Sequence, residues 1–129
     1  MSATLNVTIS PIELIFLLEA GLIYRDAGKY QEAKEIFQGV MVLRPDSDIP
    51  LVSLGTTLFV EGKIDEAIDN YRLALEKQPK SAFAYAHLGE ALFMKKDFDM
   101  ARDSLTHAIE LDEHGPYGEL ARSILEIIA

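Results

Sequence analysis

The sequence contains no cysteine among its 129 residues, so disulfide bonds and thiolate metal sites are excluded. This absence fits a reducing compartment. Basic residues are also scarce, because 12 lysines and arginines stand against 21 aspartates and glutamates, which gives a net charge of −9. An acidic surface repels phosphate groups, so we expect no nucleic-acid partner and no docking on anionic membranes. Hydrophobic residues make up 49% of the chain, enough for the core of one domain.

No segment has the features of a signal peptide or a membrane span. The most apolar stretch, residues 11–24, is preceded by no lysine or arginine, and Glu13 and Glu19 interrupt it. Signal peptides begin with basic residues and continue with an uninterrupted apolar run, and a membrane helix needs roughly 18 apolar residues. We therefore expect a cytoplasmic protein without membrane insertion, in which this stretch forms a helix.

Motifs that carry catalysis are missing as well. The sequence has no phosphate-binding glycine loop, no nucleophile elbow and no metal-binding motif. His107, Glu110 and His114 have the spacing of one helix face, but His114 follows the expected helix end and no fourth ligand is evident. We interpret these three residues as solvated surface, and we expect no enzyme activity, no cofactor and no bound metal.

What the sequence does contain is a period of 34 residues. Glycines recur at positions 21, 55 and 89, alanines at 33, 67 and 101, and prolines at 45 and 79. Several residue types that recur in one phase indicate a stacked array of similar units. The small residues allow two helices to approach closely, while large apolar residues fill the remaining gaps.

This pattern resembles the tetratricopeptide repeat, a helix–turn–helix unit of the same length, in repeats 14–47, 48–81 and 82–115. The resemblance implies an all-α solenoid of three helical hairpins. The third repeat departs from the pattern, because Lys96 replaces the glycine between the helices and Glu113 replaces the proline. This departure leaves the geometry of its turn open.

The segments that flank the repeats complete the predicted single domain, residues 11–129. We expect residues 1–10 to form an N-terminal arm, since they carry no helical period. Ser10 and Glu13 form a capping box that starts the first helix. Residues 116–129 carry apolar side chains at helical spacing, and an array needs such a helix to cap its last hydrophobic face.

The first helix of each repeat is apolar on more than one side, so it must be covered on more than one side. In tetratricopeptide arrays a second stripe, roughly 130° from the packing stripe, lines the concave groove. In this chain the second stripe and its neighbours predict a protein-binding groove. Its residues are Ile15, Leu18, Leu22, Ile49, Val52, Thr56, Phe59, Val60, Phe83, Ala86, Phe93 and Met94.

The apolar character of this stripe decides between two uses of the fold. Arrays that bind a terminal carboxylate place lysine, arginine and asparagine at positions that here hold residues such as Leu18, Leu22 and Val52. That clamp is absent, so we expect the groove to bind an amphipathic helix or an extended apolar segment. The alternative is that the N-terminal arm, the last helix or a second copy of the chain buries the same residues.

A small acidic chain with three repeats and an apolar groove is similar to the chaperones of bacterial type III secretion. Residues 28–38, followed by Leu54 and Gly55, resemble the translocator chaperones, whereas the short length and single last helix resemble the needle-subunit chaperones. The resemblance implies a cytoplasmic chaperone that keeps a secretion substrate soluble. Two other hypotheses stay open, a scaffold or adaptor that assembles a larger complex, and an array that associates with itself as a homodimer.

Overall fold

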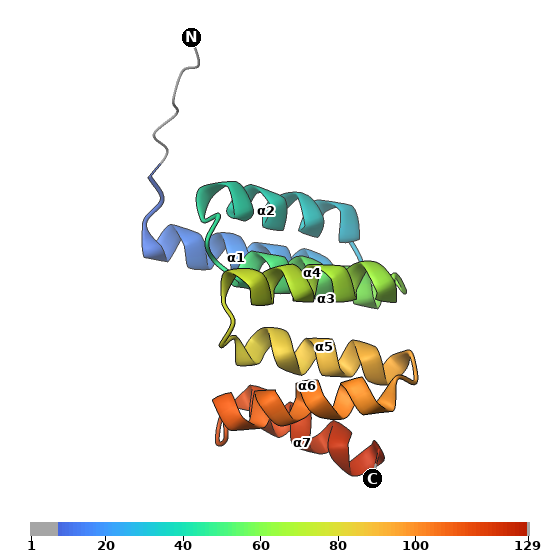
Figure 1. The fold of residues 1–129 in the computed structure, drawn as a ribbon. Coiled ribbons are helices and arrows are strands. Elements are labelled where there is room, and N and C mark those ends of the chain that lie inside the picture. Colours follow the sequence, from blue (N-terminus) through green and yellow to red (C-terminus); the bar gives the residue numbers. More distant parts are fainter. Residues whose placement is uncertain (1–7, 129) are drawn as a thin grey trace.

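The computed structural model describes residues 8–128, which form a curved stack of antiparallel helices (Figure 1). The helices are α1 (Pro11–Asp26), α2 (Tyr30–Leu43), α3 (Ile49–Val60), α4 (Ile64–Lys77), α5 (Ala82–Met94), α6 (Phe98–Leu111) and α7 (Pro116–Ile128). This arrangement confirms the predicted all-α solenoid of three hairpins and a last helix. Most of the predicted arm, residues 1–7, and the predicted helical residue Ala129 lie outside the described residues.

The three hairpin turns have the same backbone geometry, although only two of them contain glycine. Gly28, Gly62 and Lys96 all have a left-handed backbone, with φ of 78°, 87° and 66°. In each case the next residue donates a hydrogen bond back into the first helix, for example Asp97 N to Leu92 O at 3.0 Å. A left-handed conformation costs a residue with a side chain about 1 kcal/mol. The fold therefore imposes the glycine turn on Lys96.

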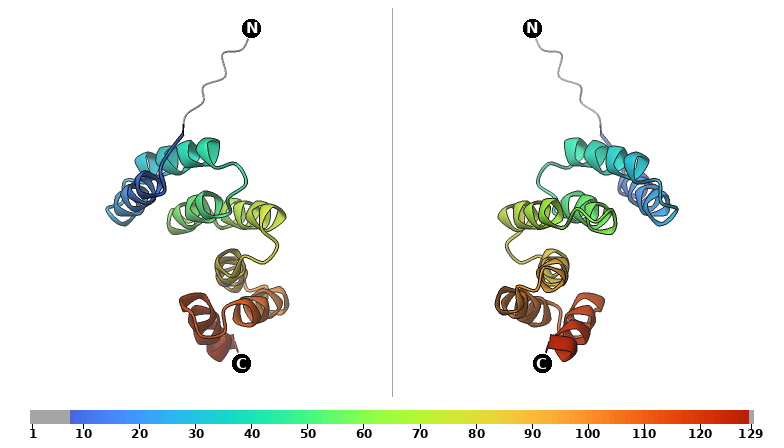
Figure 2. Two further views of the ribbon diagram at one scale, coloured as in Figure 1. Left: turned by 90° about the vertical axis from the view of Figure 1, so that its left-hand side faces the viewer. Right: turned by 90° about the vertical axis from the view of Figure 1, so that its right-hand side faces the viewer.

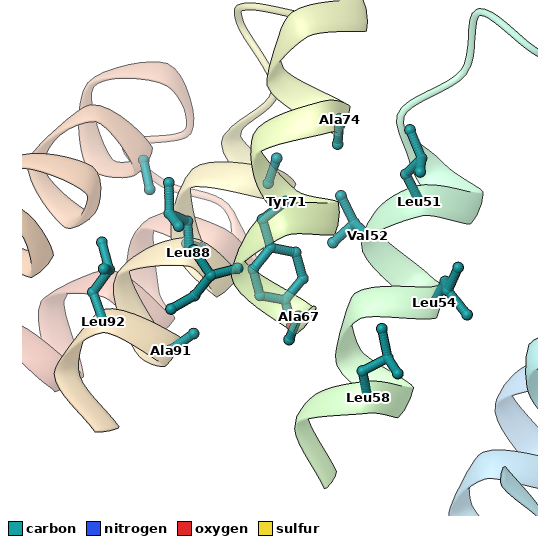
Figure 3. Close-up of a cluster of buried hydrophobic side chains, with 14 of the residues drawn as sticks. Leu51, Val52, Leu54, Leu58, Ala67, Tyr71, Ala74, Leu88, Ala91 and Leu92 are labelled. Carbon is teal, nitrogen blue, oxygen red and sulfur yellow. The ribbon is translucent and has the colours of Figure 1, made fainter. Parts of the chain in front are cut away.

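Each hairpin is closed by a large side chain that packs directly against a glycine of the preceding helix. A Cβ atom at Gly21 would lie 2.7 Å from Phe37 Cζ, and a Cβ atom at Gly89 would lie 2.5 Å from Leu105 Cγ. The middle hairpin has the same contact between Gly55 and the ring of Tyr71. Figure 3 shows this ring surrounded by other buried side chains of α3, α4 and α5. The period of 34 residues thus marks the closest helix contacts.

The last helix closes the C-terminal end of the core. α7 contacts both α5 and α6, and it buries Ala121 and Ile124. Its start is held by the Asp112 carboxylate, whose Oδ2 accepts a hydrogen bond from Tyr117 N at 3.0 Å. Because α7 has one apolar and one polar face, it covers the hydrophobic face of the third repeat and presents charged residues to solvent.

The N-terminal end of the stack has a different character. α1 packs against α2 and α3 with one side, and it leaves large apolar side chains uncovered on its outer side. Ile12, Phe16 and Ile23 are 66%, 69% and 66% exposed. One end of the solenoid is therefore covered by an amphipathic helix, while the other end remains apolar.

Candidate functional site

The inner side of the curved stack is built by α1, α3, α5 and α7, while α2, α4 and α6 form the outer side (Figure 2). Two adjoining hollows lie on this inner side. The larger hollow, of about 460 Å³, is lined by Leu22, Arg25, Thr56, Phe59, Val60, Phe83, His87, Glu90 and Tyr117. The smaller hollow, of about 290 Å³, is lined by Ile15, Leu18, Glu19, Leu22, Ile49, Ser53, Phe83 and Tyr117. Because the hollows share Leu22, Phe83 and Tyr117, we describe them together as the inner groove.

Most of the residues predicted from the second stripe come together in this groove. Those that line one hollow or both are Ile15, Leu18, Leu22, Ile49, Thr56, Phe59, Val60 and Phe83. They come from three different helices, so no single repeat builds the groove. The lining is predominantly apolar, as the sequence pattern indicates.

Four of the predicted groove residues lie elsewhere. Val52 and Ala86 have no exposed surface, because their helices are packed between neighbours on both sides and these side chains lie in the core. Phe93 and Met94 lie at the end of α5 and line neither hollow. Phe93 packs near the Phe98 ring, with a centroid distance of 5.9 Å, while Met94 is 56% exposed. A groove contact for Val52 or Ala86 would require the core to open, so the proposal below omits them.

Tyr117 is the aromatic groove residue that sequence reasoning missed. Its ring lies against Phe83, with centroids 5.0 Å apart, so α7 contributes a wall to the groove as well as a cap. The period contains the signal that finds it. Ile15, Ile49, Phe83 and Tyr117 are successive residues at intervals of 34, which makes α7 equivalent to the first helix of a fourth repeat.

Polar side chains gather at one end of the larger hollow, where the stripe is interrupted. Arg25 donates from Nη1 to Thr56 Oγ1 at 2.9 Å, and its Nη2 pairs with Asp26 Oδ1 at 3.0 Å. Glu90 Oε1 lies 3.2 Å from His87 Nδ1. Arg25 and Glu90 occupy positions of the predicted stripe, but only the structure brings them to the same hollow.

Tyr71 lies in the core close to this polar end. Burial, followed by the charge of Glu90, raises the pKa of Tyr71, and the charge of Arg25 acts in the opposite direction. The phenol therefore stays protonated at neutral pH. Its oxygen is buried and has no hydrogen-bond partner among the described residues.

The remaining candidate side chains have structural contacts. His107 Nδ1 is 2.8 Å from Asp103 O, and the His107 ring stacks on Tyr85 at a centroid distance of 4.8 Å. Among residues 8–128, no group of three or more histidine, aspartate or glutamate side chains has an arrangement that could hold a metal ion. In the same part of the chain, no helix has the length and apolar character required to cross a membrane.

Comparison with known proteins places this architecture in a family. Models of the tetratricopeptide repeat match residues 16–47 and 84–114, and a model described as TPR repeat matches residues 55–96. No curated protein matches the sequence significantly.

Solved structures resemble the chain over nearly its whole length. The type III secretion translocator chaperone SycD of Yersinia enterocolitica has a TM-score of 0.80 and 28% identity, covering 95% of this chain and 96% of SycD. SycD in complex with a peptide of the translocator YopD has a TM-score of 0.77, with the same identity and coverage. PcrH from Pseudomonas aeruginosa, with a TM-score of 0.79, 22% identity and 98% coverage of both chains, shares the fold. The chain is a protein-binding member of the tetratricopeptide repeat family, and it resembles the translocator chaperones of type III secretion.

Proposed function

We propose that the chain is a cytoplasmic chaperone that holds an apolar or amphipathic segment of a type III secretion substrate in its inner groove. The observation that carries this proposal is the continuous apolar lining contributed by four helices around two open hollows. Exposed apolar surface of this kind is usually an interface. The complex of SycD with a YopD peptide supports the same use of the fold.

The groove supplies enough apolar surface for binding of this kind. Leu22, Phe59 and Phe83 are half-buried in the isolated chain, while Ile15 and Val60 are 57% and 51% exposed. Each large apolar side chain that a partner covers contributes about 1.5–3 kcal/mol before the cost of ordering the segment. A few such contacts are sufficient for a reversible complex, which suits a chaperone that must release its client.

Two matched substitutions test the groove. Val60→Glu places a charge in the larger hollow, and Val42→Glu places the same charge on α2, outside both hollows. Val60 is 51% exposed and Val42 is 80% exposed, so neither substitution buries a carboxylate in the core. We expect both variants to keep the helical content of the wild type in far-UV circular dichroism.

The binding assay is affinity capture from the native cytoplasm, followed by mass spectrometry and light scattering of the eluate. We expect one abundant client with the wild type and with Val42→Glu, and its loss with Val60→Glu. If Val60→Glu captures the same client equally well, the groove is not the binding site. Recovery of several subunits of one complex would favour the scaffold hypothesis.

A homodimer without a client would assign the apolar surface to self-association. The exposed outer side of α1 is then the surface to test, since Ile12 and Phe16 are both more than half exposed. Light scattering of Phe16→Glu separates this case from a groove-mediated dimer. A monomer would place the contact on α1, whereas a persistent dimer would place it elsewhere.

A further inference from the structure

The larger hollow contains a carboxylate that has no cationic side chain of its own. Glu90 projects from α5 with its side chain 30% exposed, and its one polar contact among the described residues is with His87 Nδ1. That contact uses Oε1. The second carboxylate oxygen, Oε2, therefore remains available to a group that enters the hollow.

The arginine of the same hollow is already neutralised. Arg25 pairs with Asp26, and its remaining contact is the hydrogen bond to Thr56. Glu19 lines the smaller hollow and has no ion pair among residues 8–128. The inner groove therefore carries two carboxylates without an ion-pair partner other than His87, while its arginine is matched, in a chain of net charge −9. A segment that brings positive charge is complementary to it.

The surroundings of Glu90 increase the strength of such a contact. Phe59, Phe83 and Tyr117 line the same hollow, so a bound segment displaces water from around the carboxylate. Tyr71, which lies nearby in the core, stays neutral and supplies no positive charge. If an uncharged apolar side chain filled the hollow, it would remove water from Glu90 without replacing the lost hydrogen bonds, which is unfavourable.

We propose that the larger hollow is a subsite for a lysine or arginine side chain of the bound segment, with its methylene groups on Phe83 and Tyr117 and its cationic end at Glu90. This inference rests on the proposed function, because it assumes that a segment lies in the inner groove. Lysine and arginine have long apolar stems that pack along apolar walls while the charge reaches a polar group. The aromatic rings add a favourable interaction with the cation. Specificity then comes from one charge within an otherwise apolar sequence.

Selection of randomised peptides displayed on phage tests the subsite with the full chain. The wild type is expected to enrich sequences with several apolar residues and one lysine or arginine at a fixed place among them. Glu90→Gln, which can still accept the hydrogen bond from His87, is expected to keep the apolar preference and lose the basic one. Glu110→Gln, an equal charge change on the exposed face of α6, is the control and should select as the wild type does.

The affinity of one selected peptide gives the magnitude. Replacing its basic residue by norleucine, which is uncharged and of similar length to lysine, should weaken binding to the wild type about ten-fold. The same replacement should change binding to Glu90→Gln by less than about two-fold. Added salt should weaken the wild-type complex more than the Glu90→Gln complex.

The outcomes separate this inference from the proposed function. Apolar selection that depends on Val60 but shows no basic preference, or an equal norleucine effect on wild type and Glu90→Gln, overturns the subsite and leaves the groove intact. Selection of peptides that bind Val60→Glu as tightly as the wild type overturns both.

Discussion

Replacing Gly55 with alanine tests whether the close contact between α3 and α4 holds the middle repeat together. A Cβ atom at this position would lie 2.8 Å from Cδ1 and 3.1 Å from Cζ of the Tyr71 ring, with Cε1 closer still. Ordinary contacts of this kind are 3.4–4 Å long. Tyr71 has no exposed surface, so its ring cannot swing into solvent to relieve the overlap. The two helices must therefore separate.

The expected change in the free energy of unfolding combines two opposing effects. Overpacking a rigid core contact costs about 3 kcal/mol. Alanine is a better helix former than glycine by about 1 kcal/mol. We therefore expect Gly55→Ala to lose about 2 kcal/mol of stability.

Gly39 provides the matched control, because it lies in the middle of α2 and a Cβ atom there would meet nothing within 4 Å. Gly39→Ala should gain about 0.5–1 kcal/mol from helix propensity alone. Urea unfolding of both variants, followed by far-UV circular dichroism, measures the two values. If Gly55→Ala is as stable as the wild type, or more stable, the close approach does not require glycine and the packing argument fails.

Two further variants test the core and the cap. Tyr71→Phe removes a buried hydroxyl without a hydrogen-bond partner, so we expect a gain of about 1 kcal/mol in urea unfolding; a loss of that size would show that the hydroxyl is satisfied. Because burial raises the pKa of Tyr71 in the folded state, its contribution to stability is complete below the unfolded pKa of 10.0 and declines as pH rises above it. Tyr71→Phe should therefore unfold less readily than the wild type at alkaline pH, which thermal unfolding across that range measures. Gly118→Ala would bring a Cβ atom against Asp112 O and within 3.2 Å of Glu113 O, so the first turn of α7 must shift. We expect a loss of about 2 kcal/mol and faster amide hydrogen exchange in α7 than in α2; unchanged exchange in α7 would contradict the assigned contact.

The sequence was sufficient for the architecture because the features that specify it are local. Caps, turns and the spacing of small and large residues each involve side chains that are close in the chain, and a period of 34 residues repeats them. Even the irregular turn at Lys96 follows the others, since the helices on both sides fix its backbone. The second stripe likewise predicted most of the groove lining.

Which members of that stripe reach solvent was decided by the tertiary structure. Val52 and Ala86 share the stripe with Leu22 and Phe59, yet they are buried, because neighbouring repeats stack over them. The same stacking brings Tyr117 beside Phe83 and places Arg25 and Glu90 at one hollow. Helix periodicity determines the direction of a side chain on its own helix. Exposure depends also on the rotation between repeats, which results from packing contacts between residues distant in the chain.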